Sequence, residues 1–561
     1  MTDWALHPGL VLIFGGLLLV ALRGRARSVA VLALPLAALA ALWMLPEGVL
    51  WRATFLGYEV VPLAVDGLGR LFATIFAIMA LGGGLFALRA ASPLELPAAY
   101  LYAGSAIGVT LAGDLATVFV YWELMAVGST LVIWSAGTPE AWAASKRYLM
   151  VHLFGGVLLF AGVAGHVADT GSVAFTRLAL DTPAQWLILA GFLVNAGAPP
   201  LSAWLPDAYP EASWSGTVFL SAFTTKTAVY VLLRGFPGED LLLWVGLYMV
   251  FYGIVYALLE NDMRRILAYS IVNQVGFMVA GIGIGTEMAL NGSASHAFTH
   301  ILYKALLLMS AGSVLYMTGR RKCTDLGGLF QSMPLTAACG IVGAAAISSF
   351  PLTSGFVSKS MIAQAAIDEH LALAWFLLEA ASAGVFLHAG IKFPWFVFFQ
   401  KDAGLRPPDP PWSLRLAMLA FAALCIGLGI WYEPLYRMLP YPVTYVPYTP
   451  DHVIAMLQLL LFSGLAFFAM LRFLERKLTI TLDVDWLWRV AGPAAARGAT
   501  LAIAATRGAI TDWGGGVLRR VAKAVERWCG ADGVLARTWS TSAMTLWVAA
   551  LLAAYLLARY L

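Results

Sequence analysis

The sequence predicts an all-α polytopic membrane protein, because of its composition and the length of its apolar stretches. Of its 561 residues 61% are hydrophobic and only 12% are charged, and the mean hydropathy is +0.80. This balance excludes soluble globular and disordered proteins. Since a membrane-spanning helix needs about 20 apolar residues, we place about sixteen spans. They are expected near residues 9–23, 28–46, 67–89, 97–112, 115–135, 146–168, 184–203, 214–234, 240–259, 264–284, 293–317, 333–367 (interrupted), 372–398, 412–430, 453–473 and 543–560.

Basic residues between the spans predict the orientation of the chain. Arginine and lysine clusters follow odd-numbered spans, for example at 264–265, 320–322 and 472–477, whereas the acidic loop 169–181 lies on the other side. Basic loops of polytopic membrane proteins stay cytoplasmic. We therefore expect the N-terminus outside. The start, Met1–Trp4, lacks a basic n-region, which favours an uncleaved first span over a signal peptide.

Two spans are expected to be broken at comparable places by proline and glycine. One break is at Asn195–Pro206 and the other at Ser349–Lys359, where Lys359 is a lone polar residue. Interrupted helices in corresponding halves indicate a transporter built from inverted repeats. The alternative is that proline and glycine are simply frequent in membrane helices.

Three ionisable residues share one face of the span near 293–317. His296, His300 and Lys304 are four residues apart, so a helix places them on one side over about 12 Å. Ionisable groups at membrane depth are costly and usually face a protein or water-lined interior. The pattern favours a relay for protons or cations over residues that extend from a helix end to the lipid headgroups.

Other spans carry single ionisable residues. Glu123 lies in the middle of the fifth span, and Lys226 lies within apolar sequence in the eighth. Each is either part of a proton path or a group that bonds neighbouring helices, and we favour the proton path. His388 and Lys392, in the thirteenth span, are secondary candidates, because one residue near a cytoplasmic helix end often reaches the interface.

The C-terminal part differs from the rest. Residues 481–542 alternate apolar residues with arginine and lysine, a pattern typical of a helix that lies along the membrane surface. We expect Gly514–Gly516 to interrupt this lateral segment and residues 543–561 to form a terminal anchor. A solvated linker is the alternative.

No cofactor, metal site or catalytic site is expected. The four cysteines are scattered without a CxxC pair, and no phosphate-binding G-x-x-x-x-G-K-[ST] loop occurs. ATP therefore does not drive this chain directly, and any redox chemistry would belong to partner subunits. No nucleic-acid partner is expected.

Several motifs together resemble a known family. They are Asp114-Leu with Phe119-Val-Tyr-Trp-Glu123, Trp204-Leu-Pro-Asp-Ala-Tyr-Pro-Glu211, Leu267-Ala-Tyr-Ser270, His296 with His300 and Lys304, Gly355-Phe-Val-Ser-Lys359 and Leu482-Asp-Val-Asp-Trp486. With these motifs, roughly residues 60–400 resemble the antiporter-like subunits of respiratory complex I and of Mrp-type Na+/H+ antiporters. The chain as a whole looks most similar to the D subunit of Mrp-type antiporters and to related membrane-bound hydrogenase modules.

The resemblance implies an architecture. It would give about fourteen core helices with two inverted five-helix repeats and broken helices, plus an amphipathic lateral helix and a terminal anchor. It also implies a multi-pass protein of a bacterial or archaeal cell (inner) membrane. We divide the chain into N-terminal helices (1–96), first repeat (97–260), second repeat (261–400), additional helices (401–480), lateral segment (481–542) and anchor (543–561).

The resemblance also implies roles. Glu123 would be the carboxylate of the first half-channel and Lys226 the lysine that follows the Trp-Leu-Pro-Asp loop. His296, His300 and Lys304 would connect the half-channels, and Lys359 would lie near the exit. The partners would be other membrane subunits of a hetero-oligomeric complex, the lipid bilayer, H+ and, as an open alternative, Na+.

One position departs from the family. A lysine that usually pairs with the glutamate of the fifth span is replaced by Asn195, so Glu123 loses its charge partner. Either another cation substitutes, such as Lys226 or a bound Na+, or the first half-channel is weakened. The leading hypothesis is a translocating subunit of a complex. A non-conducting scaffold and a stand-alone secondary transporter are the alternatives.

Overall fold

A computed structural model describes residues 5–474 and 482–560, which divide into two units, Met1–Asp485 and Trp486–Leu561. The expected start at Met1–Trp4, the basic residues Arg476 and Lys477, and the boundary drawn at 480/481 lie outside the described residues. The chain is a multi-pass helical membrane protein, with 12 helices in the described part that are long and apolar enough to span a bilayer. The fold-class prediction is confirmed.

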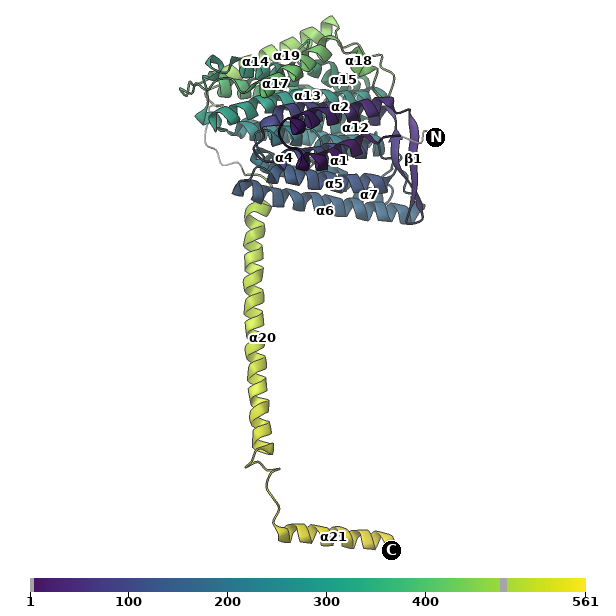
Figure 1. Ribbon diagram of the computed structural model, residues 1–561, viewed down its shortest axis with the longest axis vertical. Helices are drawn as coiled ribbons and strands as arrows, with labels where there is room; N and C mark the ends of the chain where they lie inside the picture. Colours follow the sequence, from purple (N-terminus) through teal and green to yellow (C-terminus); the bar gives the residue numbers. More distant parts are fainter. Residues whose placement is uncertain (1–4, 475–481, 561) are drawn as a thin grey trace. The chain divides into compact units, whose positions relative to one another are not determined.

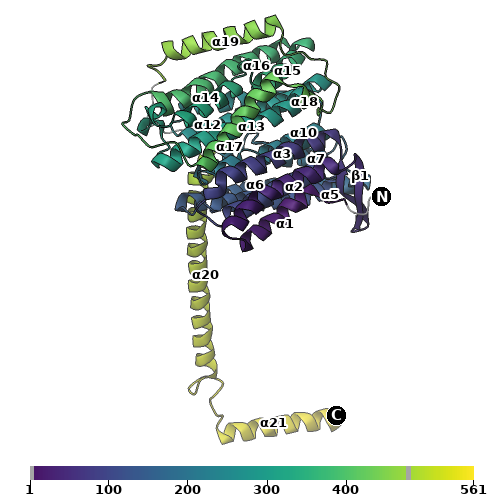
Figure 2. The ribbon, with the colours of Figure 1, turned by 45° about the horizontal axis from the view of Figure 1, so that its top comes forward.

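The first unit is a bundle of helices that run roughly side by side (Figures 1 and 2). In both views α12 and α13 lie between the helices of the first part of the chain and those of the last part. The helices up to this centre are α1 (Pro8–Ala21), α2 (Gly24–Met44), α3 (Gly67–Phe86), α4 (Glu95–Thr110), α5 (Leu115–Trp134), α6 (Pro139–Thr170), α7 (Pro183–Ala196), α8 (Trp204–Ala208), α9 (Gly216–Leu220), α10 (Thr224–Gly235), α11 (Asp240–Leu259), α12 (Met263–Ile284) and α13 (Glu287–Thr318).

The helices after α13 complete this unit. All sixteen predicted spans, including the terminal anchor of the second unit, correspond to helices or broken helices. The remaining helices of the first unit are α14 (Pro334–Ile347), α15 (Ser354–Asp368), α16 (Ala372–Val385), α17 (Trp412–Ile430), α18 (Glu433–Tyr436) and α19 (Pro450–Ala469), with π-helical turns at Phe386–Lys392 and Trp395–Phe399.

Local capping explains where several helices begin. The carboxylates of Asp114 and Asp262 accept backbone N–H groups in the first turns of α5 and α12, and the hydroxyl of Thr138 does so in α6. Each satisfies a donor that has no partner inside the helix. These polar residues sit directly before long apolar runs, so the sequence marks the starts well.

An antiparallel hairpin of β1 (Gly48–Phe55) and β2 (Tyr58–Val65) separates α2 from α3 and was not predicted. Its turn places Leu56 and Gly57 at positive φ, as a tight two-residue hairpin turn requires. The N–H of Val61 donates to Asp114 Oδ2 (2.7 Å), which attaches the hairpin to the start of α5.

Two membrane helices are discontinuous. The first pair is α9 and α10, interrupted at Ser221–Phe223, and the second is α14 and α15, interrupted at Ser348–Thr353. The second break was predicted. The predicted break at Asn195–Pro206 is instead the end of α7, where Gly197 adopts a φ of 76°, followed by the turn into α8. The helix α7 thus ends at Ala196, before Pro199 and Pro200, and the short helix α8 begins at Trp204.

The second unit consists of α20 (Gly492–Cys529) and α21 (Thr541–Tyr560), preceded by a π-helical turn at Leu487–Ala491. The prediction that Gly514–Gly516 interrupts the lateral segment is wrong, since α20 continues through it. Glycine costs about 1 kcal/mol relative to alanine in a helix. Leu518, Arg519 and Arg520, which favour helix, follow one residue after the three glycines and limit the effect.

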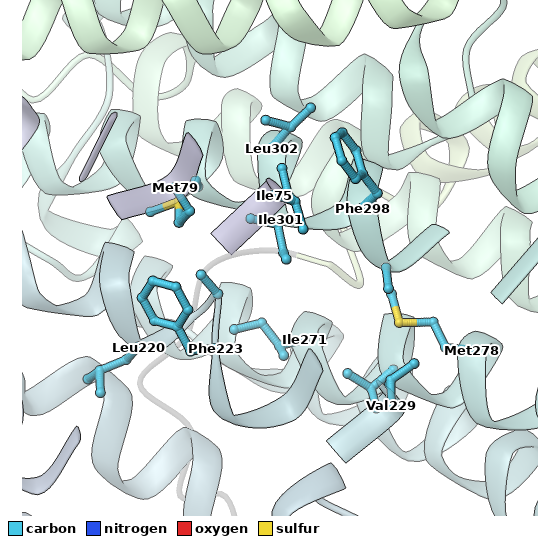
Figure 3. Close-up of a cluster of buried hydrophobic side chains, with 14 of the residues drawn as sticks. Ile75, Met79, Leu220, Phe223, Val229, Ile271, Met278, Phe298, Ile301 and Leu302 are labelled. Carbon is cyan, nitrogen blue, oxygen red and sulfur yellow. The ribbon is translucent and has the colours of Figure 1, made fainter. Parts of the chain in front are cut away.

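Apolar side chains enclose the centre of the bundle. Figure 3 shows Phe298, Ile301 and Leu302 of α13 among side chains of α3, the α9–α10 break, α10 and α12. These residues alternate along α13 with the polar residues described next. Both faces of α13 are therefore buried, one apolar and one polar.

Candidate functional site

A line of buried polar side chains follows α13. His296, His300 and Lys304 are each 0% exposed, and all three belong to one uninterrupted helix, as their spacing predicts. Burying ionisable groups is costly unless they find polar partners. The partners come mainly from α12 and α15.

His296 is held from two sides. Its Nε2 lies 3.0 Å from Gln274 Oε1 of α12, and its Nδ1 lies 3.1 Å from Ser358 Oγ of α15. Tyr303 donates its hydroxyl to the same Gln274 oxygen (3.1 Å). Ser358 is the residue directly before Lys359, so this bond connects the centre of α13 to the second discontinuous helix.

Lys304 and His300 differ in how well they are partnered. Lys304 Nζ donates to Ser270 Oγ (2.8 Å) and, at the limit of bonding distance, to the carbonyl of Leu267 (3.5 Å). Both acceptors belong to the motif Leu267–Ser270 on α12. Neither ring nitrogen of His300 has a hydrogen-bond partner within the described part of the chain. His300 therefore has unused capacity to donate or accept a proton.

Lys226 lies in the first turn of α10, just after the first helix break. Its Nζ donates to the carbonyl of Ser221 (2.7 Å) and to Thr225 Oγ1 (3.1 Å). Ser221 is the residue at which α9 ends, so its carbonyl has no helical partner. The break thus supplies the acceptor that the buried amine requires. This break was not visible in the sequence, although the lysine was.

Lys359 is 3% exposed and has no hydrogen-bond partner among the described residues. Its Nζ lies 4.6 Å from the centre of the Phe277 ring, within the range of a cation–π interaction. Glu379 of α16 interacts with it electrostatically. We did not single out Glu379, although a carboxylate within the apolar run 372–398 was a detectable signal.

Glu123 and Asn195 meet the same helix, α6. A Cβ at Gly156 would lie 2.1 Å from Glu123 Oε1, and one at Gly155 would lie 3.7 Å from Asn195 Oδ1. The two glycines make room for both side chains. Glu123 Oε1 and both amide atoms of Asn195 are buried without partners among the described residues. No lysine of the described chain forms an ion pair with Glu123.

The secondary candidates lie in the π-helical turn Phe386–Lys392. Lys392 is 5% exposed and donates to the carbonyls of Ala257, Leu258 and Glu260 at 3.0, 2.6 and 2.6 Å, which caps the end of α11. The amine of Lys392 is therefore buried against the end of α11. His388 is buried, with Nδ1 2.8 Å from the carbonyl of Gly384.

The acidic residues of the motif Trp204–Glu211 form ion pairs at one end of the bundle. Asp207 pairs with Arg147 (2.7 Å) and Glu211 with Arg321 (2.9 Å). Trp204 donates its indole N–H to the carbonyl of Val194 (2.9 Å). These residues shape the turns around the α9–α10 break rather than the polar line.

A cavity of about 520 Å³ opens beside these ion pairs. Its lining includes the carboxylates of Glu95, Glu140 and Glu211 and the guanidinium of Arg264. Glu95 is 1% exposed and accepts hydrogen bonds from Ser213 (2.7 Å) and Ser215. Glu95 was also missed, because it precedes the span near 97–112 and reads as an interfacial residue.

The motif Leu482–Trp486 attaches its first residues to α11 and α12. Asp483 Oδ2 accepts hydrogen bonds from the hydroxyls of Tyr252 (2.5 Å) and Tyr269 (2.8 Å). The hydroxyl of Tyr256 donates to the carbonyl of Leu482 (2.9 Å). Tyr269 directly precedes Ser270, which accepts a hydrogen bond from Lys304. The contact of Asp483 therefore attaches to α12 next to the residue that binds Lys304.

The buried polar line comprises Lys226, the α13 residues and Lys359, and neutral hydroxyl, amide or carbonyl groups bond Lys226, His296 and Lys304. Such groups can accept and return protons or solvate a cation. No cluster of three or more potential metal ligands occurs within residues 5–474 and 482–560.

Residues 112–385, which contain this line, match the family model described as NADH:quinone oxidoreductase/Mrp antiporter, transmembrane. This part of the chain therefore matches the family that the sequence motifs resemble. The D subunit of the Na+/H+ antiporter of Alkalihalophilus pseudofirmus is 28% identical over 412 residues, which are 68% of this chain and 83% of that protein. The predicted resemblance is confirmed.

Two solved complexes share the fold. The Mrp complex of Dietzia sp. contains a chain that matches with a TM-score of 0.75 and 25% identity over 88% of this chain, which spans 59% of that longer chain. An archaeal membrane-bound sulfane sulfur reductase contains a chain that matches with a TM-score of 0.70 over 98% of this chain and 99% of that one. With 23% identity, this likeness shows a common fold alone.

Proposed function

We propose that this protein is a proton- or monovalent-cation-translocating membrane subunit of a multi-subunit assembly of the Mrp antiporter type or a related one. The observation that carries this proposal is the buried polar line of Lys226, His300, Lys304 and Lys359 inside a membrane bundle. The match to the family model and the antiporter subunit among the similar proteins support the same conclusion.

The proposed path uses the neutral partners of each amine. Lys226 and Lys304 are held by hydroxyl and carbonyl oxygens, which accept from an ammonium or an amine alike. A proton can therefore leave one amine without stranding a fixed counter-charge. His300, which has two free ring nitrogens among the described residues, lies one helical turn from Lys304, and His296 continues toward Lys359 through Ser358.

The orientation proposed from the basic loops places the ion pairs of Arg147 and Arg321 at the cytoplasmic side, with the N-terminus outside. The cavity lined by Glu95 then lies at the cytoplasmic side, beside the loop that leads into α9. We propose it as the entry for protons. The membrane is that of a bacterial or archaeal cell, and the partners are other membrane subunits.

The path is tested by replacing its lysines in the assembled complex. We expect Lys304→Ala and Lys359→Ala each to reduce exchange of H+ for Na+ or K+ in proteoliposomes to the background, while the partner subunits still co-purify. Lys401→Ala, in an exposed loop, is the matched control and should not change exchange. Unchanged ion exchange in both Lys304→Ala and Lys359→Ala would favour a non-conducting scaffold. This second candidate function is supported by the uncharged Asn195, which stands where the resembling family has a lysine that pairs with the carboxylate of Glu123.

The type of assembly is tested by native mass spectrometry of the gently solubilised protein, with metal and flavin assays on the same sample. Small hydrophobic partners without redox centres would place it in an antiporter driven by ion gradients. Partners that carry iron–sulfur clusters or nickel would make it the pump arm of a redox complex. A lone polypeptide that exchanges ions would contradict the multi-subunit proposal.

A further inference from the structure

Two successive turns of α6 carry or contact polar atoms that have no hydrogen-bond partner among the described residues and that belong to three helices. Glu123 of α5 lies against Gly156, Asn195 of α7 lies against Gly155, and His152 is on the preceding turn of α6 itself. His152 is 1% exposed and Asn195 is 0% exposed. His152 Nε2, Glu123 Oε1 and both amide atoms of Asn195 have no hydrogen-bond partner within the described residues.

Four such atoms on or against two successive turns of α6 require an explanation. A buried polar atom without a partner costs about 1–3 kcal/mol, and most find a partner in protein or in ordered water. A buried water typically makes two to four hydrogen bonds. Here Glu123 Oε1, His152 Nε2 and Asn195 Oδ1 can accept from a water, and the Asn195 amide can donate to it.

The bond on the other side of the imidazole determines which nitrogen can accept. His152 Nδ1 lies 2.9 Å from the carbonyl of Tyr148. A carbonyl only accepts, so Nδ1 carries the hydrogen and Nε2 presents a lone pair. His152 is therefore ready to take a proton at Nε2, the atom without a partner among the described residues.

We propose that His152 exchanges protons with Glu123 through a water molecule that Asn195 holds between them. The proposal rests on the translocation function and adds a proton-carrying residue to it. In the step, the carboxylic acid of Glu123 gives its proton to the water, and the water gives one of its own to His152 Nε2. The products are a carboxylate, an imidazolium and the same water, so atoms and charge balance.

The surroundings of His152 connect it to the line described above. Its ring stacks on Tyr148, with the centres 3.8 Å apart, and the Tyr148 hydroxyl lies 3.3 Å from Thr224 Oγ1. Thr224 precedes Thr225, whose hydroxyl accepts from Lys226 (3.1 Å). The imidazole is thus linked through Tyr148 to the turn that holds Lys226.

A packing role is the competing explanation. The ring of His152 also meets Trp204 edge to face, with the centres 4.6 Å apart, and an aromatic contact of this kind stabilises a bundle without carrying protons. The test must therefore distinguish proton exchange by the His152 imidazole from its packing against Tyr148 and Trp204.

The groups that carry charge or titrate around His152 are few. Glu123 comes from α5, Tyr148 from α6 itself and Tyr209 from the turn after α8, and Asp207 of α8 is held in an ion pair. The sequence of α7 contains no titratable residue. Of these groups, only Glu123 is expected to share a proton with His152.

The experiment measures cation-driven proton exchange against pH in proteoliposomes that contain the whole complex. We expect His152→Gln, which keeps size and polarity but does not titrate, to reduce exchange at least about tenfold, as loss of a proton carrier does. Asn195→Leu, which lies outside the aromatic contacts of His152, should have a similar effect. The double variant His152→Gln with Asn195→Lys should recover exchange, because an ammonium beside Glu123 can replace the imidazole.

Each result decides the proposal. Loss in both single variants with recovery in the double variant supports it. A wild-type rate and pH profile in His152→Gln, or in Asn195→Leu, would overturn it, and so would a loss that Asn195→Lys does not restore. Lys304→Ala is measured in the same preparations. If that variant abolishes exchange while His152→Gln does not, the translocation function stands and only the role of His152 fails.

Discussion

Replacing Asp483 by alanine should release the segment Leu482–Asp485 from α11 and α12. The carboxylate is 6% exposed and accepts the hydroxyls of Tyr252 and Tyr269 at 2.5 and 2.8 Å. A hydrogen bond to a charged group contributes about 1.5–3 kcal/mol, so the two together contribute about 3–6 kcal/mol. Each 1.4 kcal/mol changes an equilibrium constant about tenfold. A loss of about 3 kcal/mol therefore raises the equilibrium constant for local opening of this segment about a hundredfold.

Hydrogen exchange measures this opening directly. The N–H of Val484 donates to Asp483 Oδ1 (2.7 Å), and we expect its protection to fall about a hundredfold in Asp483→Ala and less in Asp483→Asn, which keeps one acceptor oxygen. Asp532→Ala, at an exposed position, is the control. Unchanged exchange at Val484 in Asp483→Ala would refute the assignment of this carboxylate as the anchor.

Two further substitutions separate stability from transport. Lys392→Met leaves three carbonyls at the end of α11 without their donor, so we expect about 3 kcal/mol of lost stability and a lower Tm, with normal exchange in the complexes that assemble. A normal Tm with lost exchange would instead place Lys392 in the path. Gly156→Ala puts a methyl group where Glu123 Oε1 lies, and we expect lower exchange with intact assembly. Gly427→Ala, which has open space around its Cβ, is its control, and equal exchange in the two variants would contradict a role for the Glu123 position.

Helical periodicity explains why the polar line could be predicted from the sequence. His296, His300 and Lys304 must share a face if the span is a helix, and an apolar run of that length in a membrane can hardly be anything else. Lys226 and Lys359 were detectable for the same reason, because each is a charged residue in apolar sequence. The residue types and their spacing were therefore sufficient to predict that these five residues lie inside the bundle.

Partners and breaks were harder to predict because they depend on other helices. The interruption at Ser221–Phe223 contains no proline or glycine, whereas the prolines after Asn195 follow the end of α7. The hairpin at 48–65 was missed because β-propensity is weak without its partner strand. Glu379 is a single carboxylate whose significance comes from Lys359, which lies on another helix.

The buried lysines differ in their hydrogen-bond partners, and these partners distinguish a structural role from a transport role where the residue type does not. Lys392 donates to three carbonyls, which uses every hydrogen of the ammonium. Lys304 has one close acceptor and one distant one, and Lys359 has an aromatic face and no hydrogen-bond acceptor in the described part of the chain. A fully partnered ammonium has no reason to change its contacts, and its removal costs stability. An under-partnered amine can exchange its proton or turn to a new acceptor, so its removal should cost transport.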